Sequence, residues 1–131
     1  MEFPDNVKYT KEHEWVRLED DGSVTIGITD YAQQQLGDIV YVELPAAGED
    51  PIAKDAPFAV VESVKAVSDV YAPITGLITE VNDELPNSPE VINEDPYGDG
   101  WIIRIELTDP EEVEDLMTSA EYEQYVAEEK E

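Results

Sequence analysis

The chain has 131 residues, 41% of them hydrophobic, with 33 Asp and Glu against 7 Lys and Arg and a formal net charge of −26. This length fits one domain with its own core, and the apolar share separates the chain from disordered acidic sequences. The charge excludes nucleic acid and anionic membranes as partners, because binding either one needs clusters of Lys and Arg. Basic partners and cations are favoured instead.

The acidic residues are spread along the whole chain and are not gathered in a tail. Repulsion among so many carboxylates destabilises a compact state, and salt screens that repulsion. We therefore hypothesise that the protein is adapted to a high-salt cytoplasm and comes from a halophilic organism.

Cysteine is absent, which excludes disulfides and thiolate metal sites. The segment Met1 to Thr10 has no apolar run of the kind found in secretory signals, and no stretch is long enough to span a bilayer. We expect a soluble, cytoplasmic protein.

Short strands separated by turn signals are predicted between Glu14 and Leu107. A helix is predicted at Asp30–Leu36, ended by Gly37, and Asn82–Gly100 is expected to be mainly loop with one helical turn. The predicted strands are Trp15–Leu18, Val24–Ile28, Asp38–Leu44, Phe58–Val64, Ala66–Tyr71, Leu77–Val81 and Trp101–Leu107. This pattern favours an antiparallel sandwich or a small barrel.

The C-terminal segment changes to helical periodicity. Asp109 is a predicted N-cap and Pro110 the first helical residue, followed by acidic residues that suit the positive end of a helix dipole. We expect two short amphipathic helices at about 109–128 that pack on a β core at about 8–107. Together they make a single domain over residues 1–131.

The chain lacks the residue types that most catalytic sites use. There is no cysteine nucleophile and no Gly-rich phosphate loop, and His13 is the one histidine. We expect no catalytic residue and no metal site, with His13 a polar residue near the first strand. The acidic loop Asn93–Gly100 lacks the alternating ligand spacing of a calcium loop, so it is interpreted as a solvated turn region.

The segment "VESVKAVSDVYAP" (Val61–Pro73) carries one lysine, Lys65, between two β-branched runs with no Gly, Asn or Pro to mark a turn. A strand lysine is usually a solvated surface group. Apolar residues nevertheless reach both faces right up to Lys65, because Val60, Glu62 and Val64 alternate with Val61 and Ser63. That pattern also fits a strand that leaves a core and presents an amine for covalent modification, so the residues alone leave both interpretations open.

Four blocks of sequence together resemble the glycine cleavage system H-protein family. They occur in the family's order and cover nearly the whole chain: "YTKEHEWV" (Tyr9–Val16), "GITDYAQQQLGDIVYVELP" (Gly27–Pro45), "VESVKAVSDVYAPITG" (Val61–Gly76) and "NEDPYGDGWIIRI" (Asn93–Ile105). The resemblance implies a mainly β fold with short α segments, the barrel-sandwich hybrid of lipoyl domains, with a C-terminal helical segment.

The resemblance also implies that lipoate is bound as an amide to Lys65, at the tip of a hairpin formed with Glu62, Ser63, Val64 and Ala66. A lipoyl transferase or ligase would attach it. The protein would be a non-catalytic, monomeric carrier that moves the aminomethyl intermediate of glycine among three enzymes. These are glycine decarboxylase (P protein), aminomethyltransferase (T protein) and dihydrolipoamide dehydrogenase (L protein).

In this family the loaded arm is thought to fold back into a cleft. The resemblance places Glu14 and Asp69 beside that cleft, where carboxylates suit a cationic amine. Glu12 departs from the small polar residue that family members often carry just before the His13 position, so the third contact is either lost or taken over by an extra carboxylate. The plain alternative is that Glu14 is a surface acid and Asp69 flanks a turn.

Several other functions compete with this one. Biotin carriers favour methionines beside their lysine, whereas Val64 and Ala66 flank Lys65. Lipoyl domains of 2-oxoacid dehydrogenases lack the blocks "EHEW" and "DPYGDGW". An H-like protein that relays lipoyl groups to other proteins, and an unmodified acidic interaction module, stay open as alternatives.

Overall fold

The computed structural model describes residues 2–48 and 51–129, and within them the chain forms mainly short antiparallel strands. The strands are β1 (Lys8–Tyr9), β2 (Glu14–Leu18), β3 (Ser23–Ile28), β4 (Ile39–Glu43), β5 (Pro57–Ser63), β6 (Val67–Tyr71), β7 (Gly76–Val81) and β8 (Ile103–Leu107). The helices are α1 (Asp30–Leu36), α2 (Val91–Glu94), the 3₁₀ helix η1 (Pro110–Asp115) and α3 (Ser119–Glu129). None of these helices is long and apolar enough to cross a bilayer.

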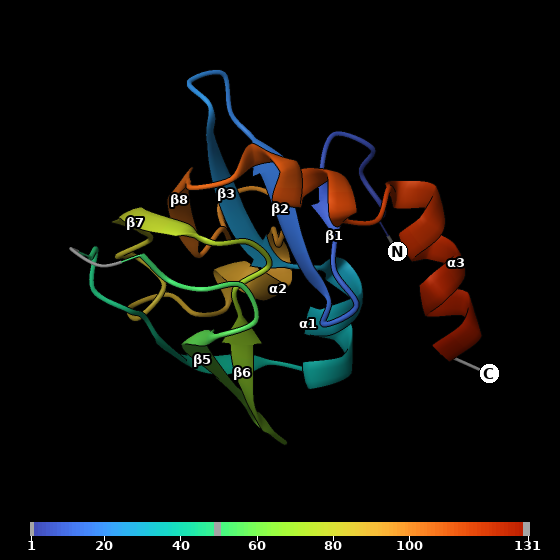
Figure 1. Ribbon diagram of the computed structural model, residues 1–131. Helices are drawn as coiled ribbons and strands as arrows, with labels where there is room; N and C mark the ends of the chain where they lie inside the picture. Colours follow the sequence, from blue (N-terminus) through green and yellow to red (C-terminus); the bar gives the residue numbers. More distant parts are fainter. Residues whose placement is uncertain (1, 49–50, 130–131) are drawn as a thin grey trace.

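The strands form two sheets. The larger has the order β1-β2-β3-β8-β7 and the smaller the order β4-β5-β6, with antiparallel pairing throughout. Figure 1 shows the β5–β6 hairpin projecting from the body of the molecule on the side away from the β2–β3 turn. The expected mainly β fold with short helices and a C-terminal helix is confirmed.

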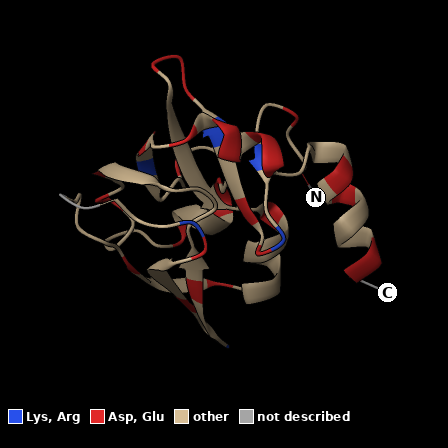
Figure 2. Ribbon diagram, in the orientation of Figure 1, with Lys and Arg blue, Asp and Glu red and all other residues tan. Residues whose placement is uncertain are grey.

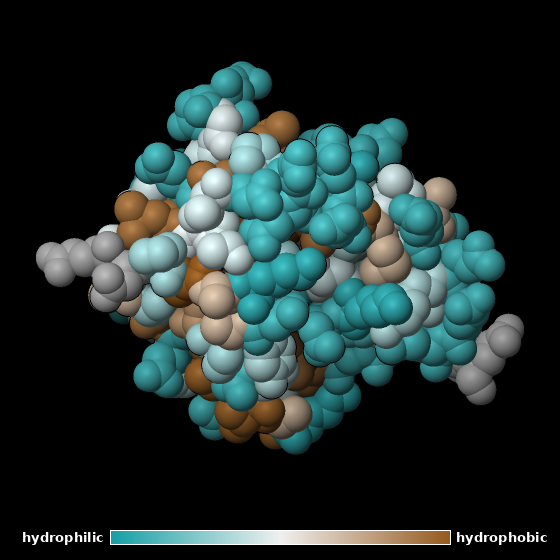
Figure 3. Space-filling view, in the orientation of Figure 1, coloured by the Kyte–Doolittle hydropathy of each residue, from teal (hydrophilic) through white to brown (hydrophobic). Residues whose placement is uncertain are grey.

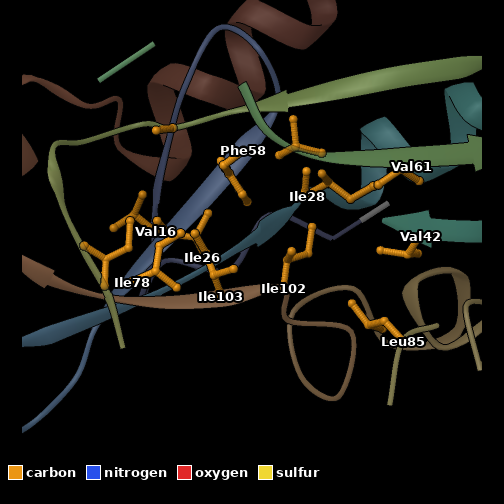
Figure 4. Packing of buried hydrophobic residues seen from close by; sticks show 14 of the residues in the cluster. Val16, Ile26, Ile28, Val42, Phe58, Val61, Ile78, Leu85, Ile102 and Ile103 are labelled. Atoms are coloured by element: carbon orange, nitrogen blue, oxygen red, sulfur yellow. The ribbon is translucent and has the colours of Figure 1, made fainter. Parts of the chain in front are cut away.

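The core lies between the two sheets. Val16, Ile26 and Ile103 of the larger sheet and Val42 and Val61 of the smaller one belong to a single buried cluster, whose side chains converge in Figure 4. Each side chain of this kind that leaves water stabilises the fold by about 1.5–3 kcal/mol. Inward residues recur at every second position in β5 from Ala59 to Ser63, as a strand requires.

A second, aromatic cluster attaches α3 to the edge of the larger sheet. The rings of Tyr9 in β1 and Tyr122 in α3 are stacked, with centroids 4.4 Å apart, and both residues are fully buried. Trp15 belongs to the same cluster, and its indole N–H donates to the Pro96 carbonyl at 2.9 Å. Figure 1 shows α3 lying beside β1, away from the smaller sheet.

Helix α1 matches its prediction residue for residue. Thr29 caps its start by accepting the Ala32 N–H, and Gly37 ends it with φ of +85°, a conformation that L-residues rarely adopt. The turn between β2 and β3 contains Gly22 at φ of +87°.

Other elements differ from the prediction in their bounds or type. The predicted strands ended at Val64 and began at Trp101, whereas β5 ends at Ser63 and β8 begins at Ile103. The first C-terminal helix, capped by Asp109 as predicted, is a 3₁₀ helix. Strand β1 was not predicted, because a two-residue strand carries too little periodicity to detect.

Asp and Glu are distributed over strands, loops and helices alike, as Figure 2 shows. The negative charge is therefore a property of the whole described surface, as the sequence predicted, and not of one segment.

Candidate functional site

The turn between β5 and β6 is held by the side chain of Ser63. Its hydroxyl oxygen accepts the backbone N–H of Lys65 at 3.2 Å and that of Ala66 at 3.0 Å, and the Ser63 N–H donates to the Ala66 carbonyl at 2.8 Å. On the other side, the Val64 N–H donates to the carbonyl of Asp38 at 3.0 Å. The backbone on both sides of Lys65 is therefore fixed, although Val64, Lys65 and Ala66 are exposed.

This cap explains why the turn contains no Gly or Asn. Tight hairpin turns usually need residues with positive φ. Among the described residues the positive φ values belong to His13, Gly22, Gly37 and Asp55, and neither Val64 nor Lys65 is one of them. The Ser63 hydroxyl takes up the free N–H groups, as Ser side chains do in local turns, so ordinary L-residues suffice.

Lys65 lies at the tip of this hairpin, close to the end of α1. A β-carbon on Gly37 would be 3.5 Å from Cε of Lys65 and 4.0 Å from a methyl carbon of Val64. The lysine stem therefore lies over Gly37, the residue that ends α1.

A pocket of about 320 Å³ lies beside the hairpin, between α1, β2 and β6. Glu14 and Asp69, the two acids that the resemblance placed beside a cleft, both line it. Glu12 lines it as well. The remaining wall comes from His13, Ile28, Tyr31, Ala32, Gln35, Leu36, Val61, Ser68, Val70 and Glu129. Much of the pocket wall is therefore apolar, and it also carries the carboxylates of Glu12, Glu14, Asp69 and Glu129.

Glu14 is buried, with 2% of its surface exposed. One carboxylate oxygen accepts the Thr10 hydroxyl at 2.7 Å and the other accepts the backbone N–H of Tyr71 at 3.2 Å. Burial is the main cause that raises the pKa of Glu14 from 4.5 to about 7, and these two hydrogen bonds oppose it. The interpretation of Glu14 as an ordinary surface acid is wrong.

Asp69 and Glu12 differ from Glu14 in their exposure. Asp69 is an exposed residue of β6 that pairs with Val60, and Glu12 is an exposed residue of the loop before β2. The pocket therefore combines one desolvated carboxylate with solvated ones, an arrangement that attracts a cation and leaves Glu14 able to gain or lose a proton near neutral pH.

His13 connects this pocket to the C-terminal helix. Its Nδ1 is hydrogen-bonded to the Tyr122 hydroxyl at 2.9 Å, and its Nε2 lies 3.1 Å from a carboxylate oxygen of Glu129. The Tyr122 hydroxyl also shares a 2.7 Å hydrogen bond with Thr29. Burial is the largest cause acting on the pKa of His13, which is lowered, while Glu129 opposes that shift.

Sequence reasoning placed His13 near the first strand but missed Glu129 and Tyr31 as pocket residues. Glu129 is separated from the other pocket residues by most of the chain and is one of many acids on α3, so no local pattern identifies it. No group of three or more possible metal ligands occurs in the part of the chain that the structure describes.

The chain was compared with known proteins. Residues 7–129 match the family model for the glycine cleavage H-protein. The glycine cleavage system H protein of Anaeromyxobacter sp. (strain K) is 55% identical over 130 residues, which cover 99% of this chain and 100% of that protein. The one from Halorhodospira halophila is 56% identical over 128 residues, 98% of each chain. A crystal structure of the Mycobacterium marinum H protein superposes with a TM-score of 0.86 at 38% identity, covering 95% of this chain and 98% of that one. The chain therefore belongs to the glycine cleavage H-protein family.

Proposed function

We propose that this protein is the lipoyl-bearing carrier of a glycine cleavage system, with lipoate bound as an amide to Lys65. The observation that carries the proposal is an exposed lysine at the tip of a capped hairpin, beside a pocket lined by carboxylates. The family assignment over residues 7–129 supports it, and favours it over a biotin carrier, a 2-oxoacid dehydrogenase lipoyl domain and an unmodified module. The whole chain, residues 1–131, acts as one carrier domain and not as an enzyme.

A fixed attachment point suits a carrier. A flexible arm on a rigid mount gives the reactive end a high local concentration at each active site without tight docking. The partners in this proposal are glycine decarboxylase, aminomethyltransferase, dihydrolipoamide dehydrogenase and the lipoyl transferase or ligase. Lipoate supplies the sulfur chemistry, and this chain supplies the position of the arm.

The pocket is where the loaded arm would rest. Its apolar wall, including Ile28, Leu36 and Val61, excludes water from a labile adduct. Glu14 and Asp69 would hold the cationic amine, and an ammonium group beside Glu14 would lower the pKa of that carboxyl by favouring its charged form. Glu12 would add a further carboxylate, in the place where family members often carry a small polar residue.

The test uses the apo protein, a Lys65→Arg variant and a Lys54→Arg control at another exposed lysine. After incubation with a lipoyl ligase, lipoate and ATP, intact mass should show one lipoyl group on the wild type and on Lys54→Arg, and none on Lys65→Arg. The wild type and the control should then support glycine-dependent carbon dioxide exchange with the decarboxylase. A correctly folded Lys65→Arg variant should not.

Protein isolated from its own host provides the second measurement. A lipoyl mass on the peptide that contains Lys65 is the expected result. A free Lys65 there, or carbon dioxide exchange supported by Lys65→Arg, would overturn the proposal.

A further inference from the structure

The C-terminal helix supplies part of the wall of the pocket beside Lys65. Tyr122, Val126 and Glu129 recur at helical spacing, so they lie on one face of α3. Tyr122 and Val126 are buried against the body of the protein, and Glu129 lines the pocket. Figure 3 shows that the surface over α3 in this view is mostly hydrophilic. Glu129 therefore differs from its neighbour Glu128, which is exposed on another face of the helix.

A series of hydrogen bonds connects Glu129 to the start of α1. The Tyr122 hydroxyl lies 2.7 Å from Oγ1 of Thr29 and 2.9 Å from Nδ1 of His13. On the other side of the imidazole ring, Nε2 of His13 lies 3.1 Å from a carboxylate oxygen of Glu129. Thr29 and Tyr122 are both fully buried, and the Thr29 hydroxyl also accepts the N–H of Ala32. The position of Glu129 is therefore tied to the buried part of the protein.

The carboxylate of Glu129 sets the direction of these hydrogen bonds. An ionised carboxylate can only accept, so Nε2 of His13 carries the hydrogen and donates it to Glu129. Burial is the largest cause acting on the pKa of His13 and lowers it, although Glu129 and Glu12 oppose that shift. The imidazole is therefore neutral above neutral pH, and its Nδ1 accepts the hydrogen of Tyr122. The oxygen of Tyr122 in turn accepts the hydrogen of Thr29.

A neutral His13 leaves the negative charge of Glu129 in place. A protonated imidazole would form an ion pair with this carboxylate and compensate its charge, whereas the neutral ring only orients it. The ring itself is firmly held, because it packs against Tyr31 and Tyr125 with centroids 4.8 Å and 5.9 Å away. Its backbone has φ of +69°, a conformation that few residues other than glycine adopt. His13 is thus a fixed support for a charged group in the pocket wall.

We propose that Glu129 is a further binding residue for the cationic amine of the loaded arm, and that His13 is the positioning residue that orients its carboxylate. The inference rests on the carrier function proposed above. Glu14 and Asp69 reach the pocket from β2 and β6, whereas Glu129 reaches it from α3. A primary ammonium group has three N–H donors, so carboxylates on separate elements can each accept one of them.

This arrangement predicts a preference for a primary ammonium group on an apolar chain. Ile28, Leu36 and Val61 offer an apolar wall to any ligand of the right size. The carboxylate of Glu129 favours the charged ligand and gives nothing comparable to a neutral one. The difference in affinity between a charged and a neutral ligand of equal length therefore measures the contribution of this charge separately from the shape of the pocket.

The apo protein can be tested with n-butylammonium as the probe and 1-butanol as its uncharged counterpart. Binding is followed in NMR titrations by the backbone amide signals of Ala32 and Val70, which line the pocket. The titrations are run at pH 8 and low salt, where Glu14, with its pKa of about 7, is mostly ionised. The measured quantity is the ratio of the two dissociation constants, in wild type, Glu129→Gln and Glu128→Gln. Circular dichroism checks the fold of each variant.

Glu129→Gln should weaken the binding of butylammonium about threefold to fivefold and leave the binding of 1-butanol unchanged, since glutamine keeps the size of the side chain and removes its charge. Glu128→Gln is the matched control, with the same loss of charge outside the pocket, and should behave as wild type. Equal weakening by the two variants would assign the effect to net charge, and equal weakening of both probes would assign it to shape. Either result, or a wild type without preference for butylammonium, overturns the inference.

His13→Asn tests the positioning role. Asparagine tolerates a positive φ, so it keeps the backbone conformation, but its shorter side chain cannot reach both Tyr122 and Glu129. This variant should weaken butylammonium binding, and adding it to Glu129→Gln should cause little further loss, because both changes remove the same interaction. Fully additive losses would show that His13 does not act through Glu129.

The imidazole can also be observed directly in the wild type, because His13 is the one histidine of the chain. Its ring nitrogen NMR signals at pH 8 should show the hydrogen on Nε2 and none on Nδ1. A hydrogen on Nδ1 would refute the direction of the hydrogen bonds and with it the orienting role of His13.

The outcomes separate the two proposals. Wild-type apo protein that gains no lipoyl group from a lipoyl ligase refutes the carrier function, and the probe titrations do not depend on lipoate. Unchanged selectivity in Glu129→Gln refutes the role of Glu129 alone. Lipoylated protein loaded by the decarboxylase should release ammonia faster in Glu129→Gln than in Glu128→Gln, and equal rates would overturn the assignment of Glu129 to the loaded arm.

Discussion

The carboxylate of Glu14, on β2, accepts the backbone N–H of Tyr71, on β6, at 3.2 Å. This single hydrogen bond joins the larger sheet to the smaller one at the wall of the pocket beside Lys65. It holds a charged group in a place where burial opposes its ionisation. A charged Glu14 therefore lowers the stability of the folded protein, whereas the proposed function uses that charge. The free energy of unfolding, measured against pH, reports this cost.

Glu14→Gln is expected to stabilise the protein at high pH. The pKa of Glu14 is raised from 4.5 in the ordinary state to about 7 in the folded protein, so the folded state holds the proton more tightly than the unfolded state. Its contribution to the free energy of unfolding is complete below pH 4.5 and is lost as pH rises through about 7. Glutamine avoids this loss, so the variant should gain up to about 3 kcal/mol at pH 8 and little at pH 4.

Urea unfolding of both proteins between pH 4 and pH 8 measures this difference. Glu12→Gln is the control, since it removes a charge from an exposed position of the same pocket. Parallel stability curves for wild type and Glu14→Gln across that pH range would show that the raised pKa is absent.

Ser63→Ala is expected to loosen the hairpin tip. Ser63 is buried, and its hydroxyl accepts two backbone N–H groups, so alanine leaves the N–H groups of Lys65 and Ala66 without that acceptor. The loss should cost about 1–3 kcal/mol of unfolding free energy. Amide hydrogen exchange at Lys65 and Ala66 should become faster than at other residues of β5 and β6.

Ser68→Ala is the matched control for this change in stability. Ser68 lies on the same hairpin, and its hydroxyl donates a longer bond of 3.3 Å to the carbonyl of Asp69. Its substitution should alter stability by only a few tenths of a kcal/mol. Equal exchange rates at Lys65 in wild type and Ser63→Ala would contradict the role given to the Ser63 hydroxyl.

The sequence predicted those parts of the fold whose signals are local. The helix Asp30–Leu36 carries its own cap and its own glycine stop, and its bounds are correct. The turn at Lys65 could not be predicted from turn propensities, because the acceptor that replaces a turn glycine is a serine at the end of a strand. That serine looks like any other small polar residue until the two strands are paired.

The candidate site was likewise predicted only in part. The pairing of Glu14 and Asp69 in one pocket was expected from the resemblance, not from their spacing, since β2 and β6 lie far apart in the chain. Glu129 was not predicted. Its place in the pocket depends on contacts between distant segments and does not alter the local pattern of the sequence.

Salt should stabilise this protein. The formal net charge of −26 is spread over the described surface, and repulsion between like charges weakens the compact state. The Debye length falls from about 10 Å at 0.1 M to about 3 Å at 1 M, so the repulsion is largely screened in molar KCl. The midpoint of thermal unfolding should therefore rise steadily over this range.

Screening must be separated from the general stabilisation that some salts give by exclusion from protein surfaces. Screening depends on ionic strength, so KCl, NaCl and KBr should act alike below about 0.5 M, where it changes fastest. A variant with Glu111→Lys and Glu123→Lys, both at exposed positions near the C-terminus, exchanges two negative charges for positive ones. It should be more stable than wild type at low salt and gain less from added KCl. If the two proteins gained stability in parallel, surface repulsion would not be the cause, and the hypothesis of adaptation to a high-salt cytoplasm would lose its physical basis.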